Sequence, residues 1–209
     1  MTGILKDSQN ISTRKNIGTG VMVFSVLQEN NSYYVDKTSF IKDLINDGKT
    51  TLLFTRPRRF GKTLTQSMLK EFLCLNYEER ADHDEKLHKL FDHLQIGADQ
   101  EFCKQHMGRY PVIFISFKGI DQSSYEGMRS ELILLIRTLY RSFAFLTERS
   151  PIGKLYLNAF SDYAELNNLK PRTDVDGQIT SSLGFLCELL NKVYDQKVVV
   201  LIDEYDVPI

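Results

Sequence analysis

The chain lacks most features that would mark a secreted, membrane-bound or strongly charged protein. Its 209 residues include three scattered cysteines and no CxxC pair, a set typical of reduced thiols in a cytoplasmic protein. The longest early apolar run, residues 21–27, is too short for a membrane span or a signal sequence. The formal net charge of −1 argues against a dedicated nucleic-acid binder. We therefore expect a soluble, cytoplasmic protein with no membrane partner.

Internal repeats and low-complexity segments are also missing, and the composition is ordinary for a globular protein. Hydrophobic residues make up 42% of the chain and charged residues 25%. The length predicts a single domain with a sizeable core. Residues 1–17 are polar and rich in turn formers, so we expect a loose N-terminal segment before a domain over residues 18–209.

The strongest functional signal lies in residues 50–63, whose sequence is TTLLFTRPRRFGKT. A short apolar strand is predicted over residues 51–55, followed by a cationic turn and a helix that begins with the letters GKT. Such a loop, between a buried strand and a helix N-terminus, holds phosphate. Its lysine reaches the outer phosphates and its hydroxyl meets Mg²⁺. The usual motif has glycine where this chain has Arg56.

Arginine and proline alter the expected path of this loop. Pro57 fixes its own φ and pushes Arg56 toward extended geometry, and a strained non-glycine residue costs about 1–3 kcal/mol. The path before Arg58 should therefore differ from that of a glycine-led loop. Residues 48–70 contain six Lys or Arg and no Asp or Glu, so the loop lies in a positive field that attracts a nucleotide or a nucleic acid.

Predicted helices and strands alternate along the rest of the chain. Helices are predicted over residues 39–47, 63–77, 78–94, 126–146, 151–167 and 179–194. A polar loop is expected over residues 168–178, and residues 21–27 fit either a short strand or the first turn of a helix. Strands are predicted over residues 110–117 and 197–202. The latter is apolar on both faces, as a central strand of a parallel sheet would be. The alternation predicts an α/β fold.

Three of the four histidines share one predicted helix but do not resemble a metal site. His83, His88 and His93 are five residues apart, which places them on different helical faces. Zinc ligands on one helix favour a separation of three or four residues. We therefore expect solvated histidines, and His106 follows in the next segment.

The second motif ends the last predicted strand. Five apolar residues, VVVLI, lead into Asp203 and Glu204, the arrangement known as Walker B. Mg²⁺ prefers oxygen ligands, so Asp203 is expected opposite Thr63 on the ion. Glu204 is expected to polarise the water that attacks the γ-phosphate. Taken alone, the acidic pair also fits the start of a turn. Asp206 fits either a supporting carboxylate or a surface turn.

Residues beside the phosphate loop allow two roles each. Arg58 and Arg59 could contact phosphates or a polyanion, or be solvated or paired with the acidic residues of the second motif. Phe60 fits a core plug behind the loop better than a base-stacking residue. Asp36 and Lys37 stand where a base pocket could lie, but helix capping is the favoured role.

Three segments, YVDKTSFI, RPRRFGKT and LIDEYDVPI, together resemble the AAA-ATPase-like family of P-loop proteins over about residues 18–209. Arginine in place of the loop glycine recurs in that family. The resemblance implies a three-layer αβα fold with a mostly parallel sheet, and ATP and Mg²⁺ as cofactors. It implies catalytic roles for Lys62 and Glu204 and metal binding by Thr63 and Asp203. It also implies that Gly61, Lys62 and Thr63 hold the phosphates. With their neighbours, the predicted nucleotide-binding residues are Arg58, Arg59, Phe60, Gly61, Lys62, Thr63 and Leu64.

Members of this family often carry a C-terminal segment of the PD-(D/E)XK nuclease superfamily. The resemblance therefore implies an ATP-binding, ATP-hydrolysing module that drives or gates an attached effector. Related sheets carry another strand between the phosphate-loop strand and the Walker B strand, later in the sequence. We thus expect a sheet that lacks its middle or is remodelled, in a truncated chain or a fragment. The alternatives are an inactive nucleotide-binding pseudo-enzyme and a nucleic-acid-binding module that uses the basic loop.

Overall fold

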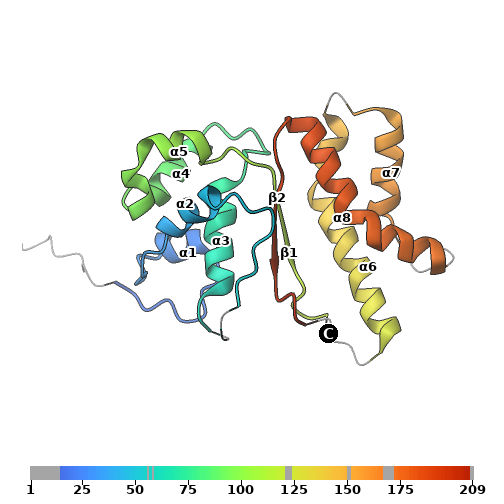
Figure 1. Ribbon diagram of the computed structural model, residues 1–209, viewed down its shortest axis with the longest axis horizontal. Helices are drawn as coiled ribbons and strands as arrows, with labels where there is room; N and C mark the ends of the chain where they lie inside the picture. The colour runs from blue at the N-terminus through green and yellow to red at the C-terminus, as the bar shows by residue number, and fades with distance from the viewer. Residues whose placement is uncertain are drawn as a thin grey trace, which may run out of the picture.

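Two parallel strands form the centre of the structure, and helices flank them on both sides (Figure 1). The computed structural model describes residues 15–55, 57, 59–120, 124–149, 152–166 and 172–207, without the side chains of residues 172–174. Strands β1 (Val112–Ser116) and β2 (Val199–Asp203) pair with Val112 opposite Val199 and Ser116 opposite Asp203. The α/β prediction is therefore confirmed, with a small parallel sheet of two strands in the described part of the chain.

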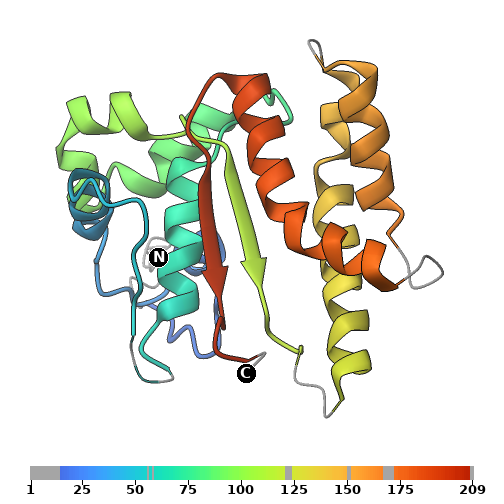
Figure 2. The same cartoon turned by 45° about the vertical axis from the view of Figure 1, so that its right-hand side comes forward.

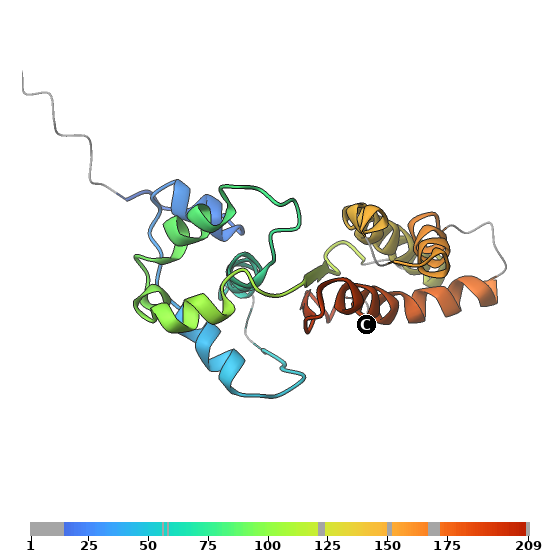
Figure 3. The ribbon, with the colours of Figure 1, turned by 90° about the horizontal axis from the view of Figure 1, so that it is seen from above.

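The helices divide into two groups, which Figure 3 shows on either side of the strands. The first group consists of α1 (Phe24–Glu29), α2 (Ser39–Asn46), α3 (Lys62–Leu73), α4 (His83–Phe91), η1 (Gln95–Ala98) and α5 (Gln100–His106). The second consists of α6 (Tyr125–Ser142), η2 (Ala144–Glu148), α7 (Lys154–Ala164) and α8 (Arg172–Tyr194). None of the described helices combines the length and the apolar character needed to cross a membrane.

Each strand contributes side chains to two separate cores. Val112 of β1 and Leu201 of β2 are buried with the first group of helices, whereas Ile113 and Ile115 are buried with the second. Successive side chains of a strand point to opposite faces, so a strand with both faces covered needs a continuous apolar run. This explains the sequences of both strands. Within the described residues β2 pairs only with β1, so its central position in a larger sheet stays a prediction.

The strand predicted over residues 51–55 is absent, because that segment belongs to no ladder in the described structure. Leu53 is 67% exposed and Phe54 45%. Apolar residues suit a strand, but a strand also needs a neighbour for its backbone hydrogen bonds. No described strand is hydrogen-bonded to this segment.

The loop predicted over residues 168–178 is wrong from residue 172 onward, because α8 begins there. Val175 is fully buried in the second core, and this packing outweighs the low helix propensity of the Asp and Gly residues around it. The helix after the phosphate loop ends at Leu73, earlier than predicted, because the chain then bonds alongside Tyr110. Residues 21–27 contain the start of α1, which is the helical alternative.

Asp36 connects the start of α2 to the segment before α5. Its Oδ1 accepts hydrogen bonds from the backbone N–H of Thr38 at 2.8 Å and from the Thr38 hydroxyl at 2.7 Å. Its Oδ2 accepts from the N–H of Gln95 at 2.7 Å. Desolvation opposes ionisation, but these hydrogen bonds outweigh it and hold the pKa of Asp36 below its usual value. The contacts give Asp36 a structural role, but the predicted helix capping is wrong, because α2 has no side-chain cap hydrogen bond at its N-terminus.

We expect Asp36→Ala to lower the free energy of unfolding by about 1.5–3 kcal/mol at neutral pH, because hydrogen bonds to a charged acceptor are lost. The folded pKa is lowered, so this contribution is complete above the unfolded pKa of about 3.9 and is lost as the pH falls through the folded value. Urea unfolding of wild type and variant at neutral and acidic pH measures both effects. Asp43→Ala, at an exposed site on α2, is the control, and an equal loss in both variants would contradict the assignment.

Candidate functional site

The two motifs meet where the N-terminus of α3 approaches the C-terminal end of β2. The Thr63 hydroxyl donates a 2.8 Å hydrogen bond to Oδ2 of Asp203, across a separation of 140 residues. Figure 2 shows α3 running beside β2, with both strands leading to the same edge of the structure. The chain therefore places a hydroxyl oxygen and a carboxylate oxygen side by side at that edge.

The environment of Asp203 is unusual for a carboxylate. The residue is only 4% exposed, and within the described residues no Lys, Arg or His forms an ion pair with it. A buried charge is costly unless it is paired or binds a metal. Hydroxyl and carboxylate oxygens suit Mg²⁺, which usually keeps several waters and phosphate oxygens as its other ligands. A fuller protein cage is missing, since the described residues contain no cluster of three His, Cys, Asp or Glu side chains.

The start of α3 has the geometry of an anion site. Gly61 precedes the helix with φ of 79°, and a Cβ added there would meet no atom within 4 Å. Glycine is therefore favoured by the left-handed backbone and not by lack of space. The first helical bond runs from the N–H of Thr65 to the carbonyl of Gly61, so the preceding amides have no intrahelical acceptor. No acidic residue occupies the first turn, and this positive end favours a bound anion.

A groove beside β2 brings further predicted residues to the same place. Its volume is about 300 Å³, and Lys62, Asp203 and Glu204 line it together with residues 49–50 and 52–54. Glu204 has φ of 53°, a left-handed conformation that costs a non-glycine residue about 1–3 kcal/mol. Strain of this kind clusters at functional sites. Here the strained residue is the half-buried Glu204, directly after the end of β2.

Gln66 is a residue of this site that sequence reasoning missed. Its Nε2 donates a 2.9 Å hydrogen bond to the carbonyl of Ile202, the residue before Asp203. Its Oε1 is buried without a partner among the described residues. Gln66 follows Thr63 by three positions, so both side chains lie on one face of α3. That spacing is the only sequence signal that could have identified it.

Two other loop residues, Arg59 and Phe60, lie at the surface. Arg59 is exposed, with φ of 67°, and makes no ion pair with a described carboxylate. Phe60 is 60% exposed, so its prediction as a core plug is wrong. The turn before Gly61 carries its ring to the surface. Arg56 and Arg58 lie outside the described residues.

The remaining candidates, Leu64 and Asp206, differ in burial. Leu64 is half-buried and packs against the first core, which leaves its backbone amide as the group that could meet a phosphate. Asp206 is exposed within a turn after β2, the surface alternative predicted for it. The histidines are a mixed case: His88 and His93 are exposed as expected, but His83 is half-buried.

Comparison with known proteins gives one family and one curated relative. The chain is 29% identical over 202 residues to "Uncharacterized protein in vnfD 5'region" of Azotobacter chroococcum mcd 1, and the match covers 94% of this chain and 30% of that protein. The chain thus spans less than a third of the relative's length. No solved structure shows significant similarity. A family model described as "Predicted AAA-ATPase" matches residues 18–209. On that match, the chain belongs to the AAA-ATPase-like family, as its sequence motifs predicted.

Proposed function

We propose that this chain binds ATP together with Mg²⁺ at the junction of α3 and β2 and hydrolyses it. The observation that carries the proposal is the 2.8 Å contact between Thr63 and Asp203, which joins the two predicted motifs at one edge of the sheet. Membership of a family of predicted ATPases supports the use of a nucleotide. The oxygen ligands and the positive helix end suit a metal-bound phosphate chain.

Each residue then has a separate task. The backbone amides at Gly61 to Leu64 and the ammonium group of Lys62 bind the phosphates, and Arg58 and Arg59 add positive charge to the loop. Thr63 and Asp203 hold the ion, which when bound neutralises developing charge on the phosphates. Glu204 orients and polarises the attacking water.

The groove beside β2 supports the three-layer P-loop arrangement as part of this proposal. The N–H of Val199 and the carbonyl of Asp203 bond toward β1. Peptide groups alternate sides along a strand, so those of Val200 and Ile202 point to the other edge. Gln66 satisfies the Ile202 carbonyl there. A further strand, of the kind that related sheets carry, would lie in this groove.

The biological task that we propose is to drive or gate an effector, nuclease-like in the family pattern. The curated relative leaves room for such an effector, because the matched region makes up only 30% of that protein. The net charge of −1 disfavours nucleic acid as the main ligand of the basic loop.

Variants of Lys62 and Glu204 test the assignment. We expect Lys62→Ala to weaken Mg-ATP binding at least about tenfold, because a charge-assisted contact to phosphate is lost. Glu204→Gln should keep binding but lower single-turnover hydrolysis at least about a hundredfold, as general-base loss does. Calorimetry and phosphate release measure the two steps. Binding without hydrolysis in wild type would indicate the pseudo-enzyme, and salt-dependent DNA binding unaffected by Lys62→Ala would indicate the nucleic-acid module.

Gln66→Leu tests whether the contact with Ile202 positions Asp203. We expect the affinity for Mg-ATP to change less than about twofold while the hydrolysis rate falls about tenfold or more, because small misplacements near reacting groups are costly. Gln105→Leu on α5, where the exposed glutamine bonds only Glu101 in the described structure, is the matched control. Equal rates in the two variants would show that Gln66 has no positioning role.

A further inference from the structure

A second, larger cavity lies between α1, α3 and α4, away from the phosphate loop. Its volume is about 960 Å³, at the upper end of the range for small-molecule sites. None of Lys62, Thr63, Asp203 and Glu204 lines it. Glu71, which does line it, follows Lys62 by nine positions on α3, roughly 13 Å along the helix axis at 1.5 Å per residue. The cavity is therefore distinct from the proposed ATP site.

One wall of the cavity holds the carboxylate of Glu71, in which one oxygen is hydrogen-bonded within the described structure and the other is not. The Ser67 hydroxyl accepts a 3.0 Å hydrogen bond from the N–H of Phe24 and donates a 2.8 Å bond to Oε1 of Glu71. Oε2 of Glu71 is buried and has no partner among the described residues. A buried polar atom left unpaired is energetically costly. The arrangement holds one oxygen in place and leaves the other for a donor.

On a second wall, a glutamine amide has its oxygen in contact with a partner and leaves its N–H donor unused. Oε1 of Gln28 on α1 lies 3.3 Å from Nε2 of His93, while the buried Nε2 of Gln28 has no partner in the described structure. At the start of α4, Nε2 of His83 is likewise buried and unpartnered within that part of the chain. Gln28, Glu71 and His83 all line the cavity. It therefore presents an unused acceptor, an unused donor and an imidazole nitrogen from three different helices.

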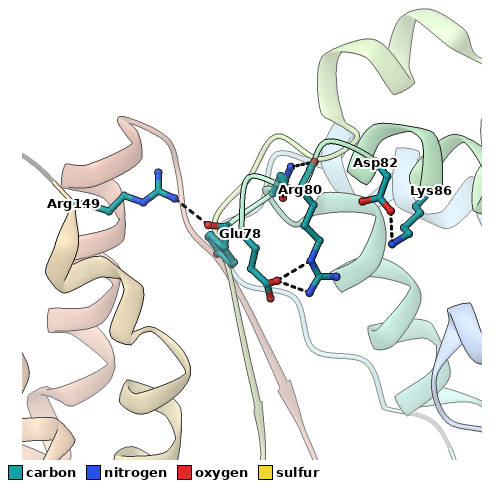
Figure 4. Close-up of polar contacts among 7 residues, drawn as sticks. Glu78, Arg80, Asp82, Lys86 and Arg149 are labelled. Carbon is teal, nitrogen blue, oxygen red and sulfur yellow. Dashed lines mark hydrogen bonds and ion pairs between the residues drawn. The ribbon is translucent and has the colours of Figure 1, made fainter.

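The lining also carries lysines that an anionic group of a ligand could contact. Five Lys or Arg residues line the cavity against three Asp or Glu residues. Arg80 and Lys86 form ion pairs with Glu78 and Asp82, as Figure 4 shows. Within the described residues no ion pair engages the other three cations, Lys15, Lys70 and Lys89. Three cations without an ion pair in the described structure therefore face the three carboxylates of the lining, and these lysines are the groups available to a phosphate.

We propose that this cavity is a second ligand site, which binds a nucleotide independently of the ATP site. A nucleobase presents an N–H donor next to an acceptor atom, and these would bond Oε2 of Glu71 and Nε2 of Gln28, which have no partner among the described residues. The phosphate of the nucleotide meets the lysine-rich part of the lining. Purine and pyrimidine nucleotides share this chemistry, and the relative affinities of AMP, GMP and UMP identify the preferred base. This site does not rest on ATP hydrolysis at the α3–β2 junction.

The test uses the full chain with Lys62→Ala, so that the phosphate loop contributes little to binding. AMP, GMP and UMP are titrated separately, with ribose 5-phosphate as the base-free probe, and binding is followed by calorimetry and by amide chemical shifts. We expect at least one nucleotide to bind at least about tenfold more tightly than ribose 5-phosphate, since hydrogen bonds to charged groups contribute about 1.5–3 kcal/mol. Shifts should appear at Gln28, Glu71 and His83.

Glu71→Gln and Gln28→Leu, each added to this background, should weaken that binding at least about tenfold, by the same loss of a hydrogen bond. Glu29→Gln is the matched control, because Glu29 is an exposed carboxylate of the same lining, and it should change affinity less than about twofold. Circular dichroism melts confirm that each variant folds. The proposal is overturned if no nucleotide binds at millimolar concentration, if ribose 5-phosphate binds equally well, or if both variants match the control.

Discussion

The hydrogen bond between Thr63 and Asp203 is the contact on which the functional interpretation depends. It forms only because α3 packs along β2 and because β2 pairs in parallel with β1. Parallel pairing in turn requires both faces of the strands to be covered, and the two helical groups provide that cover. The arrangement of the whole chain therefore brings two short polar segments together at one edge of the sheet.

Much of this arrangement could be predicted from the sequence. The apolar runs around Phe114 and Val200 indicated buried strands, and periodic apolar residues indicated most of the helices. Residues 51–55 show the limit of such reasoning, because whether an apolar segment pairs depends on a neighbour that the pattern does not contain. Val175 shows a second limit, because its burial stabilises a helix through a sequence that local propensity assigns to a loop.

For the site, too, some residues could be predicted from the sequence and others could not. Glycine, lysine, threonine and paired carboxylates at the ends of predicted elements made the meeting of Thr63 and Asp203 an expectation, while their roles in binding and catalysis stay predictions. Gln66 could not be singled out, because a lone polar residue within a helix fits a solvated face equally well. Phe60 was expected inside and lies outside, because its position depends on how the turn closes before Gly61. The exposure of such turn residues is set by backbone geometry more than by hydrophobicity.

Two carboxylates lie in the linings of the two candidate sites. Asp203 is a buried carboxylate that accepts a hydrogen bond from the Thr63 hydroxyl. Glu71 has one oxygen hydrogen-bonded to Ser67 and the other buried without a partner among the described residues. Burial makes each of them costly, and each lines a separate cavity. The energetic cost is offset if ligands complete the two environments, a metal-bound triphosphate in one and a nucleotide in the other.

The most direct test of the central claim is calorimetric titration of the protein with ATP, in Mg²⁺ and in EDTA, for wild type and Asp203→Asn. The account predicts saturable binding that depends on Mg²⁺ in wild type and is at least about tenfold weaker in the variant, because the carboxylate that holds the ion is lost. Absence of binding heat in wild type, or equal affinity with and without Mg²⁺, would contradict it.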